Sequence, residues 1–249
     1  MKYTQKKISD ILESLEGVDI DLSGDDLSFL DLSGADLRGA NLRGANLKEA
    51  NLRDSNLRYA DFRRAKLKEA KISRSDLTGA DLRDADIEGA DLSDSVLVCA
   101  SFRKSNMEHT YLRGADLRSA DLRGVNLKHS NLKNAIMRWA IMSGADLSGA
   151  ILTNTDVRNA RMKSVNLSET HLEGCTGNGC EIKSIFALEH QITYTKSDIQ
   201  IGRRNHPIEL WRRFDDQAII KMGGRAFLDF WLKNKSTILY IVEQSPAGE

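Results

Sequence analysis

The sequence predicts an all-β solenoid, preceded by a short helix and followed by a small α+β module. Three observations favour this architecture. Counting in fives from Leu22 to Leu172, all thirty-one positions are Leu, Ile, Val, Met or Phe. Two residues before most of these positions the chain has Ala or another small residue. The strict period ends near Cys175, where the core composition changes from aliphatic to aromatic.

A period of five residues fits a closed coil and does not fit a helix. Residues two apart on an extended chain point to the same side, so the small and the large apolar residue face the interior together. The apolar residues of an amphipathic helix recur at three- and four-residue spacing, so a period of five would leave no buried stripe. The chain before Cys175 is therefore expected to wind with Leu and Ala inside and polar groups outside.

The N-terminal segment, residues 1–18, predicts a helix that caps the open end of the coil. Apolar residues from Ile8 to Leu15 recur at helical spacing, and Gly17 provides a stop. Open solenoid ends expose apolar surface and unpaired strand edges, so capping is the expected role. A partner-binding helix is the alternative.

Residues 176–249 predict a small module of short strands followed by helices. The expected strands are residues 181–188, 190–195 and 198–202. His206 and Pro207 predict the start of a helix, with Pro at the first helical position. Gly223 and Gly224 separate a second helix from a last one that spans about residues 225–244.

The repeat itself resembles a known family. Residues 35–62 read as units of the form A-(D/N)-L-(R/K/S/T)-X, and over residues 19–175 the chain resembles the pentapeptide repeat proteins. The resemblance implies a right-handed quadrilateral β-helix with four units to a coil of about twenty residues. At ~4.8 Å per coil, seven to eight coils would form a rod ~36 Å long. Residues 199–231 resemble a C-terminal segment of bacterial and phage-associated members.

Composition argues against several classes of partner. Lys plus Arg and Asp plus Glu both number 36, so no net field attracts nucleic acid or an anionic membrane. Three Cys do not make a disulfide framework, and no apolar stretch approaches the ~20 residues of a membrane span. We expect a cytoplasmic protein, of a bacterium or of the host if phage-encoded, with no membrane partner and no nucleic-acid partner.

No pattern predicts catalysis, a cofactor or a metal site. The five His have no metal-ligand spacing, and the outward Asp residues recur with the repeat, where each can accept backbone hydrogen bonds at a turn. Cys175 and Cys180 follow His171 in a Gly-rich bend. Two unremarkable thiols are the favoured interpretation there, and a zinc or redox site is the alternative.

Function is therefore expected on the outward faces of the coil, where residues twenty apart form columns. One column is basic: Arg43, Arg63, Arg83, Arg103 and Arg123. It is either a neutralised solvated face or a docking stripe for an acidic partner or for phosphates. A second face offers Tyr59, Arg118, Arg138 and Trp139, the residue types that dominate protein interfaces. The alternative for its later residues is packing beneath the C-terminal module.

The tail supplies candidate dimer or packing residues: Trp211, Phe214, Phe227, Trp231 and Ile238. Together these observations predict a non-catalytic, homodimeric rod of bacterial or phage origin. It would bind and modulate a protein partner through its Arg and aromatic faces or through its C-terminal module. The alternative comes from the resemblance, because some relatives bind type II topoisomerases as DNA mimics. The balanced charge and the absence of loops within the coil weigh against a DNA gyrase modulator.

Overall fold

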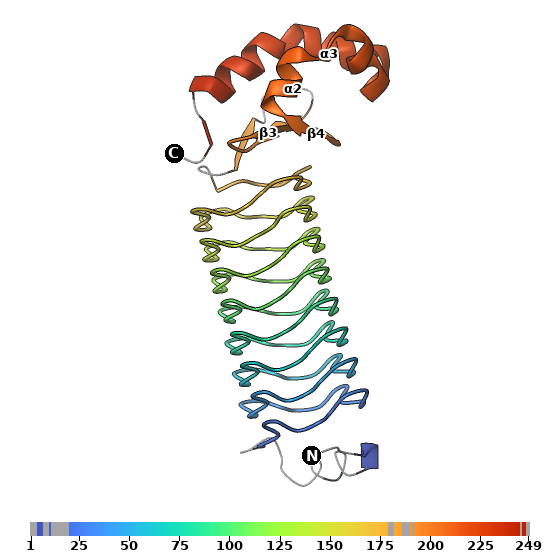
Figure 1. The fold of residues 1–249 in the computed structure, drawn as a ribbon, viewed down its shortest axis with the longest axis vertical. Helices are drawn as coiled ribbons and strands as arrows, with labels where there is room; N and C mark the ends of the chain where they lie inside the picture. Colours follow the sequence, from blue (N-terminus) through green and yellow to red (C-terminus); the bar gives the residue numbers. More distant parts are fainter. Residues whose placement is uncertain are drawn as a thin grey trace.

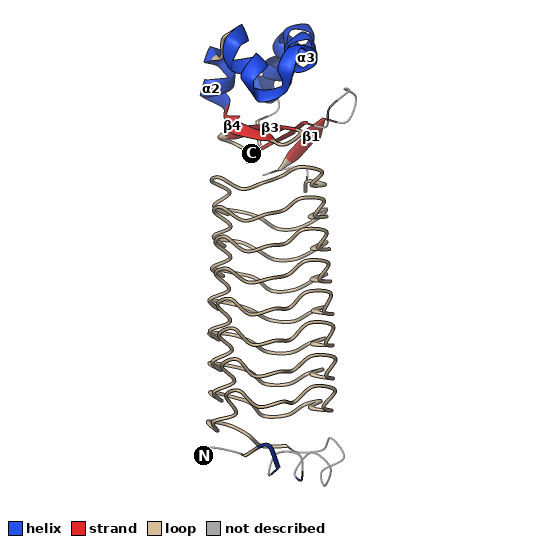
Figure 2. Ribbon diagram, turned by 90° about the vertical axis from the view of Figure 1, so that its right-hand side faces the viewer, coloured by secondary structure: helices blue, strands red, loops and turns tan. Residues whose placement is uncertain are grey.

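The coil is a solenoid whose turns repeat every twenty residues. The computed structural model describes residues 4–6, 10, 20–178, 182–185, 190, 192–244 and 246–247. Parallel β-bridges join residues twenty apart, from Asp21 with Asn41 to Asp156 with Thr176. Figures 1 and 2 show the coils stacked into a rod with the C-terminal module across its end. The expected N-terminal helix lies almost wholly outside the described residues.

Each side of the square ends in a tight turn whose third residue is left-handed. A backbone hydrogen bond closes the turn, as from Ala45 N to Leu42 O at 3.1 Å. The φ angle lies between 55° and 71° at every fifth residue from Gly24 to Gly174, as a type II turn requires. Twenty of these thirty-one corners carry a residue other than Gly, at a cost of about 1 kcal/mol each. The surrounding ladder and core must hold this strain.

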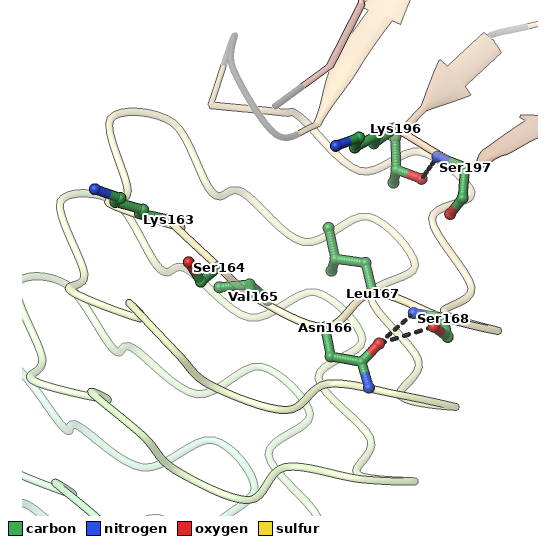
Figure 3. Close-up of a pocket in the computed structure, with 9 residues that line it drawn as sticks. Lys163, Ser164, Val165, Asn166, Leu167, Ser168, Lys196 and Ser197 are labelled. Carbon is green, nitrogen blue, oxygen red and sulfur yellow. Dashed lines mark hydrogen bonds between the residues drawn. The ribbon is translucent and has the colours of Figure 1, made fainter. Parts of the chain in front are cut away.

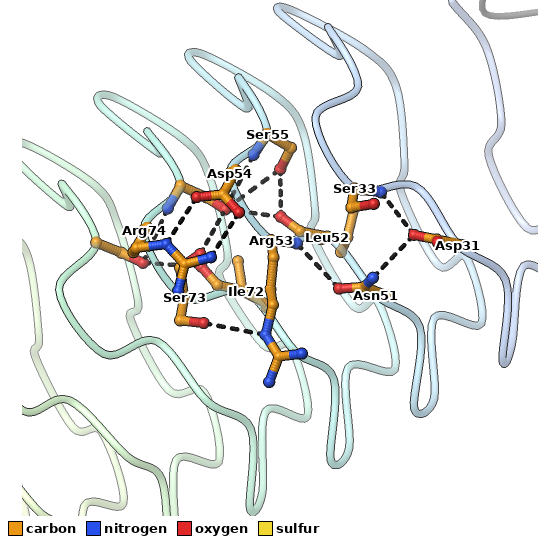
Figure 4. A network of polar contacts seen from close by, with 12 residues as sticks. Asp31, Ser33, Asn51, Leu52, Arg53, Asp54, Ser55, Ile72, Ser73 and Arg74 are labelled. Atoms are coloured by element: carbon orange, nitrogen blue, oxygen red, sulfur yellow. Dashed lines mark hydrogen bonds and ion pairs between the residues drawn. The ribbon is translucent and has the colours of Figure 1, made fainter.

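Outward Asp and Asn side chains tie each turn to its neighbours. Asp21 Oδ1 accepts a hydrogen bond from Ser23 N at 3.0 Å, which confirms the structural role predicted for the recurring carboxylates. Asn41 Nδ2 donates to the same oxygen from the next coil at 3.0 Å. Figure 4 shows the same pattern, with Asn51 donating to Asp31 at 2.8 Å. These side chains reinforce the backbone ladder on its solvent side.

The interior contains Leu and Ala together with a short ladder of hydroxyls. Ser55, Ser75 and Ser95 occupy the small-residue position of three consecutive coils and are buried. Ser55 N donates to Ser75 Oγ at 3.3 Å, and Ser75 Oγ donates to Leu52 O at 2.7 Å. In other turns the carbonyl at the position of Leu52 accepts the backbone N–H that closes the turn. Here this carbonyl accepts a hydrogen bond from a Ser hydroxyl instead.

The C-terminal module is a four-stranded antiparallel sheet covered by two helices. The strands lie side by side in chain order: β1 (Lys183–Ile185), β2 (Ile192–Tyr194), β3 (Asp198–Ile201) and β4 (Arg204–Pro207). The helices α2 (Ile208–Arg213) and α3 (Asp216–Gln244) lie on the side of the sheet away from the coil (Figure 2). Helical geometry breaks within α3 at Gly223 and Gly224, as the sequence predicts.

The predicted start of the first helix is wrong. His206 and Pro207 lie in β4, where Pro207 pairs with Asp198 of β3. β4 is an edge strand, so the missing N–H of Pro207 need not interrupt the ladder. The backbone of Pro207 is extended, with φ −53° and ψ 142°, and α2 begins only at Ile208. Pro207 therefore occupies the cap position and not the first helical position.

Amide side chains satisfy backbone groups at both ends of the coil. At the C-terminal end, the buried Gln200 of β3 accepts a hydrogen bond from Leu172 N. At the N-terminal end, Asp31 N donates to Gln5 Oε1 at 2.8 Å, and Gln5 Nε2 donates to Asp31 O at 2.7 Å. These amides replace the hydrogen bonds that a further coil would supply.

Candidate protein-binding site

The basic column runs along one face of the coil, and most of its charge is neutralised locally. Arg63, Arg83 and Arg123 each form a two-point ion pair with the Asp two residues earlier, at 2.5–2.6 Å. Two residues before Arg43 and Arg103 the chain has a neutral residue in place of Asp. Neither of these arginines forms an ion pair with any described residue. Of the two interpretations, this geometry favours a solvated face over a continuous docking stripe.

The ion pairs of this face lower the pKa of two of its carboxylates, Asp61 and Asp121. The hydrogen bond from Arg63 is the largest cause of the lowered pKa of Asp61, and the bond from Arg123 acts in the same way on Asp121. Both Arg side chains remain exposed to solvent. Such surface pairs typically contribute under about 1 kcal/mol to stability.

The second face carries exposed aromatic and apolar side chains, and we call it the aromatic face. It comprises Tyr59, Val96, Val98, Cys99, Ile136 and Trp139. Tyr59 is 65% exposed and Trp139 is 54% exposed, and no described residue covers them. Val96 and Ile136 are also exposed. Packing beneath the C-terminal module therefore does not account for Trp139 or Ile136.

The two aromatic residues occupy left-handed corners of the coil. The φ angles of Tyr59 and Trp139 are 58° and 59°, in the region that favours Gly. The Tyr59 ring lies over Gly79 of the next coil, where an added Cβ would come within 2.6 Å of it. The Arg58 guanidinium lies 5.7 Å from the centre of the same ring. Tyr59 is thus held against the rod while most of it stays in solvent.

The arginines of the aromatic face are paired unequally. Arg118 binds Asp116 at 2.6 Å. Arg158 and Arg138 share Asp156, at 2.8 and 2.5 Å. The hydrogen bond from Arg158, assisted by that from Arg138, lowers the pKa of Asp156 to about 2. Two guanidiniums on one carboxylate leave a net positive charge beside the Trp139 corner.

The coil at the centre of the aromatic face has no charged side chain on this side. Val96, Val98 and Cys99 fill all three outward positions of one side of one coil. Cys99 lies two coils from Tyr59 and two from Trp139, since the coil repeats every twenty residues. An apolar stretch therefore lies between the two aromatic corners.

The tail residues predicted for dimerisation or packing lie within the module. Trp211, Phe227, Trp231 and Ile238 are buried there, and Phe214 is half-buried. Trp211 Nε1 donates to Ile199 O at 2.7 Å, and the rings of Trp211 and Trp231 are 4.9 Å apart. The exposed apolar residues of α3 are Leu232 and Tyr240 instead.

Chemistry that depends on metals or thiolates finds little support. Among the described residues, no group of three His, Cys, Asp or Glu side chains could hold a metal. Burial raises the pKa of Cys175 to about 12, and a protonated thiol is a poor ligand and nucleophile. Cys180 lies outside the described residues. Within the part of the chain that the structure describes, no helix is both long and apolar enough to cross a bilayer.

A solenoid of twenty-residue coils, with a Leu and Ala interior and one left-handed corner per five residues, defines a β-helix built from pentapeptides. The family model for pentapeptide repeats matches residues 20–58, 60–97, 100–138 and 140–176, in eight copies. The chain belongs to this family, whose fold is a right-handed quadrilateral β-helix. Its members are generally non-catalytic structural or interaction proteins.

Several solved structures are similar to this chain. A trypsin-treated variant of QnrB1, a plasmid-mediated fluoroquinolone resistance protein, is 21% identical, with a TM-score of 0.48, and the match covers 64% of this chain and 87% of that one. HetL, a pentapeptide repeat protein involved in heterocyst differentiation regulation in the cyanobacterium Nostoc, is 26% identical, with a TM-score of 0.29 and coverage of 68% and 96%. A pentapeptide repeat protein of the Arabidopsis thaliana thylakoid lumen is 30% identical, with a TM-score of 0.34 and coverage of 42% and 69%. No curated protein matches the chain significantly.

Proposed function

We propose that this chain is a non-catalytic rod that binds a protein partner through its aromatic face. The observation that supports the proposal is the placement of Tyr59 and Trp139, both exposed and both at left-handed corners. Neither side chain contributes to the core, and each strains its corner by about 1 kcal/mol. Aromatic and Arg side chains grouped on a rigid surface are typical of interface hot spots.

The dimensions of the aromatic face indicate the kind of partner surface that it fits. Four coils separate Tyr59 from Trp139, a distance of about 19 Å at the usual strand spacing. A single α-helix with its side chains is about 10–12 Å wide. We infer that one helix of the partner crosses the rod between the two corners, with apolar residues on Val96 and Cys99. An acidic residue of that helix would meet the excess charge of Arg138 and Arg158.

Capture from bacterial lysate with the full-length chain as bait tests this proposal. We expect a partner that wild type retains and Trp139→Glu loses, because a buried carboxylate would replace the aromatic anchor. Tyr111→Glu is the matched control, since Tyr111 is 54% exposed on a different face. A partner retained equally by Trp139→Glu and Tyr59→Glu would place recognition elsewhere. Loss with Tyr111→Glu as well would contradict the assignment to this face.

Modulation of DNA gyrase by DNA mimicry is the alternative function. The expected length of the rod, ~36 Å, favours this alternative, because one turn of a DNA duplex is about 34–36 Å long. The charge opposes it, because Arg63, Arg83 and Arg123 neutralise the carboxylates beside them. We expect micromolar protein to leave gyrase supercoiling unchanged, and inhibition or protection of the enzyme in that assay would reverse the ranking.

We also propose that the protein is a homodimer formed through the outer face of α3. The aromatic residues of the tail are committed to the module core, so they are not available for this contact. Leu232 and Tyr240 are 57% and 63% exposed and lie eight residues apart on one side of the helix. A two-fold pairing of α3 with its copy would bury both.

A further inference from the structure

A binding site for an anion needs cations that point to one place. The hollow between the coil and the C-terminal module does not provide them, although residues 163–168 and 195–197 bound it and the half-buried Leu167 lies among them. Figure 3 shows the Lys163 side chain directed away from Lys196. On the aromatic face, in contrast, two guanidiniums meet at a single carboxylate.

The aromatic face carries one positive charge more than it has carboxylates. Within residues 36–178 its three columns contain five Arg, four Asp and no other charged side chain. Three of the arginines pair one to one with an Asp, at 2.6–2.8 Å: Arg38 with Asp36, Arg58 with Asp76, and Arg118 with Asp116. The other two, Arg138 and Arg158, share Asp156. The unbalanced charge therefore lies at one end of the face, the end that carries Trp139.

The sequence of two adjacent coils brings these two guanidiniums together. Ile136 occupies the position two residues before Arg138, where other coils have an Asp. Arg138 Nε donates instead to Asp156 Oδ2, in the next coil, at 2.5 Å. Arg158 donates to the same carboxylate through Nε at 2.9 Å and through Nη2 at 2.8 Å, the latter to the same Oδ2. Both guanidiniums thus lie within hydrogen-bond distance of one oxygen. We call Arg138, Asp156 and Arg158 the two-arginine site.

Much of the hydrogen-bonding capacity of the two-arginine site is open. Arg138 donates only through Nε, so neither of its Nη atoms binds a described residue. Nη1 of Arg158 also has no acceptor among the described residues. The Asp156 side chain is 16% exposed, whereas those of Arg138 and Arg158 are 39% and 49% exposed. The carboxylate therefore holds from below two guanidiniums whose remaining donors reach solvent.

The Tyr59 end of the same face has the equivalent pair without the second guanidinium. Arg58 Nη1 donates to Asp76 Oδ2 at 2.8 Å, across the same eighteen-residue separation as Arg138 and Asp156. Thr78 occupies the position that corresponds to Arg158, and its hydroxyl donates to Asp76 at 2.5 Å. One guanidinium faces one carboxylate there, so the Tyr59 end is neutral.

We propose that the two-arginine site binds a phosphate monoester, carried on a phosphorylated side chain of the protein partner. A single Arg can bind both oxygens of a carboxylate. A phosphate monoester has three terminal oxygens and a charge of about −1.5 to −2, so it uses donors of both guanidiniums. Arg clusters are typical of surfaces that recognise phosphorylated segments. The inference rests on the proposed function, since it specifies the acidic residue of the partner helix.

Calorimetric titration of the full-length protein with phenyl phosphate tests the site without the partner. We expect one site in wild type. Arg158→Thr, which reproduces the arrangement at Thr78, should bind about tenfold or more weakly, because one of the two guanidiniums is lost. The reverse change, Thr78→Arg, should create a second site at the Tyr59 end and raise the stoichiometry from one to two.

Arg38→Gln is the matched control, because it removes an Arg of the same column that has its own Asp. It should bind phenyl phosphate as wild type does. Benzoate, which has the same ring with a carboxylate, should bind more weakly than phenyl phosphate. Equal affinity for benzoate, unchanged affinity of Arg158→Thr, or no binding to wild type would each overturn the proposal.

Capture from phosphatase-treated lysate separates this inference from the proposed function. We expect the partner that depends on Trp139 to be captured from untreated lysate and lost after treatment. A partner captured equally from both lysates, and still lost with Trp139→Glu, would leave the proposed function intact and overturn the phosphorylated side chain. Phenyl phosphate bound as expected, with no partner captured from either lysate, would support the two-arginine site and count against the proposed function.

Discussion

Each corner of the coil has one residue with a φ near 60°. Gly44 and Arg64 are corner residues twenty positions apart, so they lie in the same column on adjacent coils. Nothing lies within 4 Å of a Cβ added at Gly44, so Gly44→Ala introduces backbone strain alone. We expect it to lower the free energy of unfolding by about 1 kcal/mol, and Arg64→Gly to raise it by about 0.5–1 kcal/mol. Urea denaturation of both variants measures the two changes. Changes of the same sign in both variants would show that corner strain does not control stability.

Asp156 makes the free energy of unfolding of the coil depend on pH in the acidic range. Its pKa is lowered from 3.8 to about 2 by Arg158 and Arg138, so the stabilisation is complete above pH 3.8 and is lost as the pH falls through about 2. The arginines are partly exposed, which limits the contribution to about 1–2 kcal/mol. Asp156→Asn should be less stable by this amount at pH 7, and the difference should disappear near pH 2. Urea midpoints of the two proteins at pH 7, 4 and 2 test this, and a pH-independent difference would contradict it.

At the scale of elements, Gln200 joins the sheet to the coil. Gln200→Ala would leave the buried Leu172 N–H without its acceptor, at a cost of about 1–3 kcal/mol. The exposed Gln217 of α3 provides the matched control, because Gln217→Ala removes an amide that lies in solvent. Thermal unfolding should separate the two variants clearly. Equal melting temperatures would mean that the sheet does not depend on this bond.

The elements differ in how far the sequence predicts them. The coil is predictable because its period of five fixes both the inward positions and the columns on each face. β4 is not, because Pro207 is compatible with a helix start and with an edge strand, and only pairing with β3 decides between them. The incomplete burial of Leu167 cannot be predicted either, because its place in the repeat is that of every fully buried Leu. Its environment depends on where the sheet crosses the end of the coil.

At the scale of the molecule, the candidate surface could be predicted only in part. The twenty-residue period places Tyr59 and Trp139 in one column, and that column was predicted from sequence. The sequence indicates the pairs between an Arg and the Asp two residues earlier, but it does not indicate that Arg138 and Arg158 converge on Asp156 from different coils. The period gives the column of a residue, and side-chain geometry gives its charge environment.

The oligomeric state is the remaining property of the whole molecule. We expect sedimentation equilibrium of wild type to give a dimer, and Leu232→Glu or Tyr240→Glu to give a monomer. Charge repulsion across a two-fold axis acts twice, because each variant side chain of one copy faces the same surface of the other. Both positions are exposed on α3, so neither change disturbs the packing of Trp231 beneath the helix. Trp139→Glu, on the coil, should remain dimeric. A wild-type monomer at micromolar concentration would refute this interface, and dimers in both α3 variants would place the contact on another surface.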